Sequence, residues 1–164
     1  MCSSDLKLPF FRRAMRSMGN GCDVVTYLGG FTRDAIKGAL GERPQLVQIA
    51  PGIALDFFTP GPKPVDLVER YRLKSAPTIL CVGRLVKRKG QDKLISALPK
   101  IKEEFPNVKL LVVGEGPLGK KLFKLVKKLG LEDNVIFTGR VSYEELPKYF
   151  RVGDIFAKIG RAHV

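Results

Sequence analysis

The stretch "CVGRLVKRKGQD", residues 81–92, carries the clearest structural signal in the chain. The apolar run at 79–82 predicts a buried strand that ends at Gly83. Four cations then precede a second glycine and an amphipathic segment: Arg84, Lys87, Arg88 and Lys89. So basic a turn indicates either a well-solvated corner of the surface or a site for an anion.

Short apolar runs alternate with amphipathic segments along the rest of the chain. We expect strands at 23–27, 45–50, 78–83, 108–113, 134–138 and 154–157, and helices at 7–19, 29–41, 65–72, 91–104, 118–129 and 142–151. This alternation predicts an α/β fold, a Rossmann-like parallel sheet with helices on both faces. Ser142 and Glu145 have capping-box spacing and predict the start of the last helix. Pro99 and Pro147 fall inside expected helices and argue against their continuity.

Composition narrows the functional classes. The chain has 164 residues, 45% hydrophobic and 27% charged, which allows one core or one domain with part of another. No apolar run approaches the ~20 residues of a membrane-spanning helix. The first residues lack a secretory signal pattern, so we expect a cytoplasmic protein. Scattered cysteines argue against a disulfide framework or a zinc site, and the lone His163 excludes a His-dependent triad or metal cluster.

Positive charge is concentrated in the middle of the chain. The net charge is +13, and residues 84–130 hold thirteen Lys and Arg against four Asp and Glu. Such a field attracts polyphosphates, nucleic acid or anionic lipid. In "KKLFKLVKKLG", residues 120–130, the aliphatic residues share one helical face, so an outward solvated face explains most of the lysines. Phenylalanines fall mostly at strand or core-facing positions, which weakens the case for nucleic acid.

The two ends resemble a translated sequencing adapter. "MCSSDL" and "KIGRAHV" back-translate to codons whose shared part is reverse-complementary. We expect residues 1–6 and 158–164 to be this artefact, with no part in the fold. His163 then carries no functional meaning.

Three strand ends carry residues suited to a ligand, because open α/β sheets bind ligands beyond the carboxyl ends of their strands. At the first, Gly83 lets a phosphate approach the backbone, while Arg84 offers a bidentate fork and Lys89 a point charge. The third, "IFTGRVS" at 136–142, is a strand, a glycine turn and a helix start, and its spacing assigns no chemistry.

The second strand end leaves other functions open. "VVGEGPLG" places Gly114, Gly116 and Gly119 in a G-x-G-x-x-G pattern between a strand and a helix, as in a dinucleotide site. Such a site expects an acid about twenty residues on, but here Arg140 follows the next strand and could accept a 2′-phosphate. The glycines are more typical of a tight strand-to-helix turn, so an NADP-binding oxidoreductase module is only an alternative, and a nucleic-acid-binding domain that uses residues 84–130 is a second.

Five stretches, taken together, resemble the family 4 glycosyltransferases, which are retaining enzymes of the GT-B fold. They are "DVVTYLGGFTRDAI", "IAPGIALDFFTP", "ILCVGRLVKRKGQDKLISALPKI", "LLVVGEGP" and "VIFTGRVSYEELPKYFRVGDIFA". They follow the family's order and cover nearly all of residues 20–157. Their amino-acid sequences are most similar to those of bacterial mannosyltransferases that act on phosphatidylinositol mannosides. The resemblance implies hexose transfer, with mannose from GDP-mannose favoured over a UDP-sugar, to a lipid or glycan acceptor.

The resemblance also implies which residues bind the donor. It assigns Gly83, Arg84 and Lys89 to the donor diphosphate, Gly139, Arg140 and Val141 to the turn along the nucleotide base, and Gly114, Glu115 and Gly116 to a further donor contact. Fixed cations that face the leaving diphosphate would lower the barrier without a metal. No cofactor is implied, and the sequence has no Asp-x-Asp metal motif. The implied partners are a nucleotide sugar, the acceptor and an anionic membrane surface, not nucleic acid.

Finally, the resemblance divides the chain. It implies that residues 7–50 are the tail of an acceptor domain, 51–62 a crossover, and 63–157 a truncated nucleotide-sugar-binding domain. The family's acceptor-side histidine would precede residue 7, and its paired glutamates would follow residue 157. We therefore expect no catalytic residue in this polypeptide, and no activity from it alone.

Overall fold

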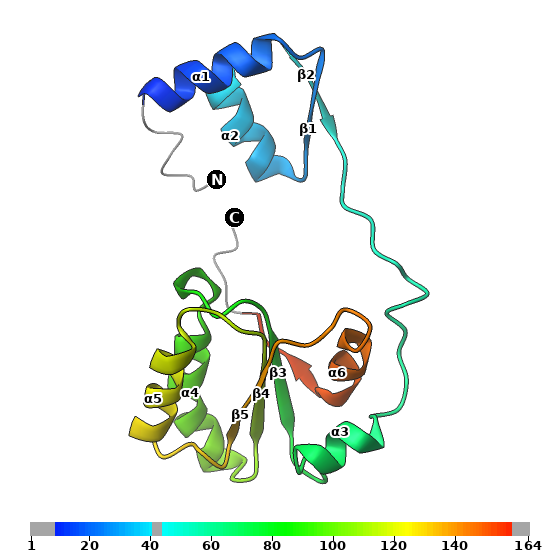
Figure 1. The fold of residues 1–164 in the computed structure, drawn as a ribbon, viewed down its shortest axis with the longest axis vertical. Coiled ribbons are helices and arrows are strands. Elements are labelled where there is room, and N and C mark those ends of the chain that lie inside the picture. The colour runs from blue at the N-terminus through cyan, green and yellow to red at the C-terminus, as the bar shows by residue number, and fades with distance from the viewer. Residues whose placement is uncertain (1–8, 41–43, 159–164) are drawn as a thin grey trace. The chain divides into compact units, whose positions relative to one another are not determined.

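The computed structural model describes residues 9–40 and 44–158. They fall into two compact units, one ending at Ile53 and one beginning at Ala54 (Figure 1). The suspected adapter segments lie outside the described residues, apart from Lys158. In the described part of the chain, no helix is long and apolar enough to cross a membrane.

The first unit is a small α/β piece. Its elements are α1 (Pro9–Asn20), β1 (Val24–Tyr27), α2 (Gly30–Leu40) and β2 (Gln45–Gln48). The two strands are parallel, with Val24 opposite Gln45. Two contacts join the helices. Arg12 Nη2 donates to Gly38 O over 2.9 Å, and the Leu40 side chain packs against Gly19, which has no side chain to obstruct it. The expected order of helix, strand, helix and strand is confirmed.

The second unit contains the longer sheet. Its elements are α3 (Val65–Arg70), β3 (Thr78–Val82), the 3-10 turn η2 (Lys87–Lys89), α4 (Gln91–Glu104), β4 (Lys109–Val113), α5 (Gly119–Lys128), β5 (Val135–Gly139), α6 (Leu146–Val152) and β6 (Ile155–Phe156). All four strands are parallel, in the order β5-β4-β3-β6. The chain moves outward from β3 to β5 and then returns to the other side of β3. The carboxyl end of β3 therefore lies where the strand order reverses, which is the usual ligand position in such sheets.

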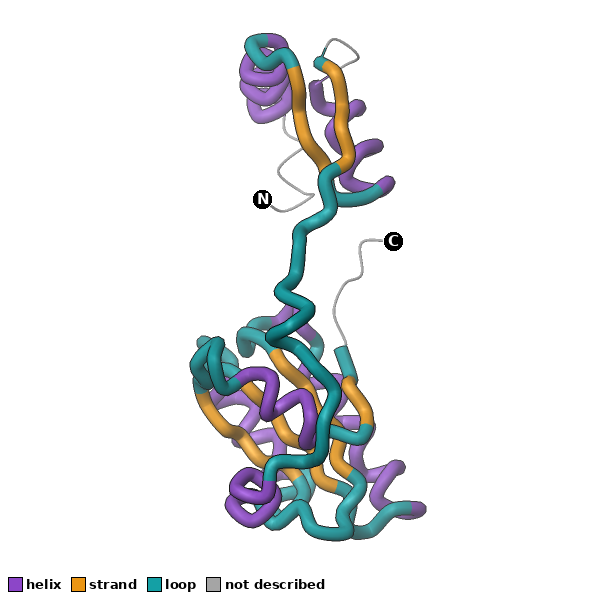
Figure 2. Tube along the Cα trace, turned by 90° about the vertical axis from the view of Figure 1, so that its right-hand side faces the viewer, coloured by secondary structure: helices purple, strands orange, loops and turns teal. Residues whose placement is uncertain are grey.

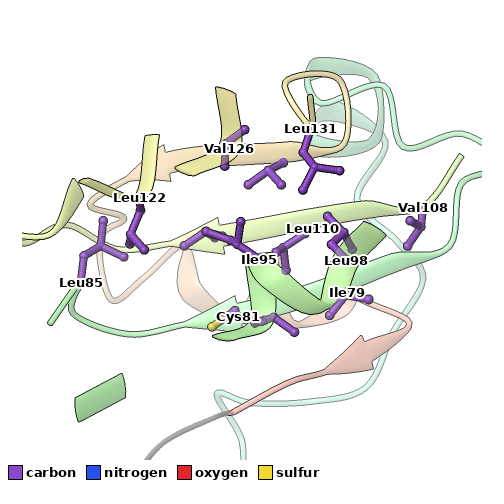
Figure 3. Packing of buried hydrophobic residues seen from close by; sticks show 13 residues of the cluster. Ile79, Cys81, Leu85, Ile95, Leu98, Val108, Leu110, Leu122, Val126 and Leu131 are labelled. Atoms are coloured by element: carbon purple, nitrogen blue, oxygen red, sulfur yellow. The ribbon is translucent and has the colours of Figure 1, made fainter. Parts of the chain in front are cut away.

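Alternate residues of the central strands pack against two helix layers. Ile79 and Leu110 face α4 and α5, in a cluster that includes Ile95 and Leu98 (Figure 3). The neighbouring Leu80 and Leu111 face α3 and α6 in a second cluster. Figure 1 shows the two helix pairs on opposite sides of the strands. A sheet buried on both faces explains why β3 and β4 read as continuous apolar runs, and the expected fold class is confirmed.

The two helices that contain proline have different outcomes. Helix α4 has the expected bounds, 91–104, and continues through Pro99. Helix α6 begins at Leu146 rather than at 142, because Pro147 fits the first helical turn and residues 143–145 form a turn before it. The hydroxyl of Ser142 still accepts a bond from Glu145 N over 3.3 Å, but it caps this turn instead of the helix.

The segment between β2 and α3 contains no helix or strand (Figure 2). Its second half is nonetheless fixed to the second unit. Phe57 stacks on Tyr143 with ring centroids 4.9 Å apart, and Arg151 donates to both Thr59 O and Thr59 Oγ1. These contacts agree with Ala54 as the first residue of the second unit.

Candidate functional site

The carboxyl ends of β3, β4 and β5 meet at a shallow pocket of about 610 Å³. Three turns line it, and we call the turns after β3, β4 and β5 the first, second and third turn. The lining residues are Arg84 from the first, Glu115 and Gly116 from the second, and Arg140 from the third. All four were expected at the site. A larger hollow of about 1130 Å³ lies at the opposite end of β3, beside Pro77 and Asp154, and no expected site residue lines it.

The first turn places the two cations expected to hold a diphosphate. Gly83 N donates to Val113 O, and Leu85 N donates to Glu115 O, so the backbone on both sides of Arg84 is fixed to the neighbouring turn. The Arg84 side chain is exposed at the pocket. Lys89 does not line the pocket, but its stem passes within 4.0 Å of the position that a Cβ on Gly83 would occupy. Both cations are therefore anchored in one turn.

The second turn has glycines because the first turn packs directly on it. A Cβ on Gly114 would lie 2.3 Å from Gly83 O, and one on Gly116 would lie 2.6 Å from Leu85 O. Buried Leu85 also accepts a bond from Leu118 N. Gly114 and Gly116 therefore make room for protein backbone, whereas a Cβ on Gly119 would meet only Leu85 Cδ1 at 3.7 Å. Two glycines of the G-x-G-x-x-G pattern thus have a structural reason that does not require a dinucleotide.

The third turn completes the rim of the pocket. Gly139 adopts a φ of +73° and accepts a bond from Gly114 N over 2.9 Å, which joins the second and third turns. Arg140 lies at the pocket, whereas the Val141 side chain packs against the α3–α6 core cluster. Only the backbone of Val141 is thus available for the contact with a base that the resemblance implies.

The pocket is positively charged at its rim. Arg140 Nη1 lies 3.9 Å from Glu115 Oε1, and both side chains are largely exposed, so this ion pair is weak and leaves the guanidinium accessible. Beneath the turn, burial raises the pKa of the Cys81 thiol, which keeps it a protonated, unreactive part of the core. Two guanidinium groups around one hollow suit an anion with several oxygens, such as a diphosphate.

One residue of this region was not expected from the sequence. Gln91, the first residue of α4, is only 2% exposed, and its Nε2 donates to Arg84 O over 3.1 Å. A lone glutamine at a helix start has no sequence signature that separates it from a surface residue. Its role depends on a turn geometry that the sequence does not reveal.

The family model described as "Glycosyl transferases group 1" matches residues 68–158, more than half of the chain. The chain belongs to the group 1 glycosyltransferases. The matched residues include β3, β4, β5 and all three turns around the pocket. Membership of this family overturns both alternatives, the oxidoreductase module and the nucleic-acid-binding domain.

Curated relatives of this glycosyltransferase include lipid mannosyltransferases. The chain is 42% identical over 151 residues to "GDP-mannose-dependent alpha-(1-6)-phosphatidylinositol monomannoside mannosyltransferase" of Mycobacterium tuberculosis, covering 92% of this chain and 39% of that protein. It is 33% identical over 90 residues to "Alpha-D-kanosaminyltransferase" of Streptomyces kanamyceticus, covering 55% and 23%. The chain thus spans about two fifths of the length of the first relative.

Solved structures agree on the fold. Anabaena Alr3699/HepE in complex with UDP-glucose superposes with a TM-score of 0.82 at 23% identity, over 99% of this chain and 43% of that one. The C-terminal domain of a group 1 family glycosyltransferase (LpcC) from Francisella tularensis superposes with a TM-score of 0.52 at 28% identity, over 64% and 57%. The second unit therefore has the Rossmann-like fold of the carboxyl-terminal half of these enzymes.

Proposed function

We propose that this chain carries the donor-binding part of a retaining mannosyltransferase, which transfers mannose from GDP-mannose to a phosphatidylinositol mannoside. The observation that carries the proposal is the 42% identity to such an enzyme over 92% of the chain. In this proposal residues 7–50 belong to the acceptor domain, 51–62 to the crossover and 63–157 to the donor domain.

The donor diphosphate would bind at the first turn. Arg84 can form a bidentate contact with phosphate oxygens, and Lys89 can add a point charge from the same turn. Negative charge grows on the diphosphate as the bond to the sugar breaks, so cations already fixed there stabilise the transition state more than the ground state. No metal ion is needed in this scheme.

The remaining pocket residues would bind the rest of the donor. Gly139, Arg140 and Val141 would run along the base, with backbone groups making the hydrogen bonds. Gly114, Glu115 and Gly116 would form the floor beneath the diphosphate, which agrees with the packing of Gly114 and Gly116 under the first turn. The 164 residues alone are expected to bind nucleotide without transferring sugar, because the family's paired glutamates are not among them.

Helix α5 would bring the protein to an anionic membrane at the cytoplasmic face, where a lipid acceptor lies. Its outward residues are exposed, namely Lys120, Lys121, Lys124, Lys127 and Lys128. Among them Phe123 is 51% exposed, with Lys127 Nζ 5.5 Å from its ring centroid. Lysines around an accessible aromatic ring suit the interface of an anionic bilayer.

Nucleotide binding tests the donor site. We expect GDP to bind the wild-type chain, and Arg84→Ala or Lys89→Ala to weaken binding roughly tenfold or more, since each removes a charge-assisted bond. Arg88→Ala is the matched control, because it removes the same charge from an exposed position in the same turn. Amide signals of the labelled protein, followed during titration with GDP, UDP and NADP, measure each affinity. The proposal would be contradicted if all three variants lost the same GDP affinity, or if the wild-type chain bound NADP more tightly than GDP.

A further inference from the structure

The β3–α4 turn has a side-chain tether that none of the roles described so far requires. Gln91 Nε2 donates to Arg84 O over 3.1 Å, and this link joins the carboxyl end of β3 to the first residue of α4. The same carbonyl accepts from Val86 N over 2.9 Å, while Leu85 N donates to Glu115 O over 2.9 Å. The peptide unit that follows the Arg84 Cα is thus held at both its carbonyl and its N–H.

The tether affects both donor-binding cations. Fixing the peptide after Arg84 fixes the direction in which the Arg84 side chain leaves the backbone. Lys89 lies between the tethered ends, followed by Gly90 in the left-handed conformation at a φ of +69°. Closing the turn from 84 to 91 therefore limits where Lys89 can move as well.

The same side chain is poorly suited to a purely structural role. Gln91 Oε1 is buried and has no hydrogen-bond partner among the described residues. A buried, unpaired carbonyl lowers stability relative to an apolar group of the same shape. Gln91 therefore offers one useful hydrogen bond to the turn and costs stability at its other atom.

We propose that Gln91 is a positioning residue for the donor diphosphate, which it serves by holding the Arg84 carbonyl and closing the basic turn. This inference rests on the proposed function. It predicts that nucleotide affinity and stability respond in different directions when the amide is replaced by an apolar group of similar length. A structural residue would move both together.

The variant Gln91→Met tests the inference, because methionine keeps the length and cannot donate to Arg84 O. We expect GDP affinity to fall about fivefold or more, while the free energy of unfolding stays equal or rises. The matched control is Asn134→Leu. Among the described residues, Asn134 is the other buried amide with an unpaired oxygen. Its Nδ2 donates to Val108 O over 2.9 Å, and it precedes β5 at the far end of the sheet. This control is expected to leave GDP affinity unchanged.

A second readout examines the turn without nucleotide. Amide hydrogen exchange of Val86, whose N–H bonds to Arg84 O, is expected to accelerate in Gln91→Met while exchange in β4 is unchanged. The inference would be overturned if GDP affinity were unchanged in Gln91→Met, if both variants lost the same GDP affinity, or if Val86 exchange were unchanged. None of these results would count against the proposed function. Failure of the wild-type chain to bind GDP would instead count against the proposed function, and Val86 exchange would still decide whether the tether exists.

Discussion

Gly114 is the residue at which the fold and the site meet most closely. Its φ is +131°, and an added Cβ would lie 2.3 Å from Gly83 O, so neither the backbone conformation nor the space accepts a side chain. Any larger residue must push the first turn away from the second. Because Arg84 follows Gly83 directly, such a shift also moves the cation at the pocket.

The substitution Gly114→Ala is therefore expected to lower the free energy of unfolding by roughly 1–3 kcal/mol and to weaken GDP binding. Gly119→Ala in the same glycine pattern is the control, since the nearest atom to its Cβ would be Leu85 Cδ1 at an ordinary 3.7 Å. We expect the control to be neutral or slightly stabilising, as alanine favours helix α5. Urea unfolding of both variants measures the difference, and equal stabilities would refute the packing argument.

Single residues also show how much of the candidate site could be predicted from the sequence. Arg84 was expected at the site because open α/β sheets bind ligands beyond the carboxyl ends of their strands, whereas Glu115, Gly116 and Arg140 were assigned to the donor site through the family resemblance. A tight strand-to-helix turn was expected at the glycines, but the packing of the first turn on Gly114 and Gly116 was not, since a close approach of two backbones leaves the same sequence pattern as a ligand turn. Gln91 could not be recognised for a similar reason, because its partner is a carbonyl that every residue possesses.

Among the elements, the buried strands were clearly predictable, whereas the start of α6 was not. Strands β3 and β4 lie between two helix layers, so nearly every side chain in them is apolar and the pattern is unambiguous. The start of α6 depends instead on a competition between Ser142 and Pro147, which local spacing does not resolve. Strand β6 and the segment before α3 are joined by one carboxylate, Asp154, which the sequence did not single out.

Asp154 gives the second unit a predictable response to acid. Partial burial alone would raise the pKa of its carboxyl, but bonds from Lys63 Nζ (2.6 Å) and Thr78 N (2.9 Å) outweigh burial, so the pKa is lowered. The stabilisation is therefore complete above the unfolded pKa of about 3.9 and disappears as the pH falls through the lower folded value.

We expect Asp154→Asn to be less stable than the wild type at pH 7, by less than about 1 kcal/mol because the pair is partly exposed. The difference in the free energy of unfolding between the two proteins should be smaller at pH 3, where protonation of the wild-type carboxylate begins to remove its stabilising charge. Urea unfolding at both values measures it, with exposed Asp133→Asn as the control for a general loss of negative charge. If the difference in the free energy of unfolding stayed constant with pH, the charge of the Asp154 carboxylate would not be the source of the stabilisation.

At the scale of the whole molecule, the excess of positive charge is the dominant surface property. The net charge is +13, and α5 presents a continuous basic face with an exposed aromatic ring. Sequence reasoning located this face, but it placed the phenylalanines mostly at strand or core-facing positions, which is wrong for Phe123. An exposed ring among lysines favours contact with a bilayer over simple solvation.

Vesicle binding tests this contact. We expect the chain to sediment with vesicles of phosphatidylcholine and phosphatidylinositol, and much less with phosphatidylcholine alone. Lys120→Gln with Lys124→Gln should weaken binding by about 2 kcal/mol, at about 1 kcal/mol per lysine. The control removes two exposed lysines from α4, Lys93 and Lys100, and thus keeps the same net charge. If the two double variants bound equally, the attraction would be general and α5 would have no special part.

The attachment of residues 54–59 to the second unit has a practical consequence for anyone dividing this gene. A donor-domain clone that begins at residue 63 would discard Phe57 and Thr59, which removes the ring stacked on Tyr143 and both hydrogen-bond acceptors that Thr59 offers to Arg151. Chimeras that exchange units between related chains face the same hazard at their junction. The safer junction lies upstream of Ala54, so that residues 54–59 stay in the same polypeptide as the unit they contact.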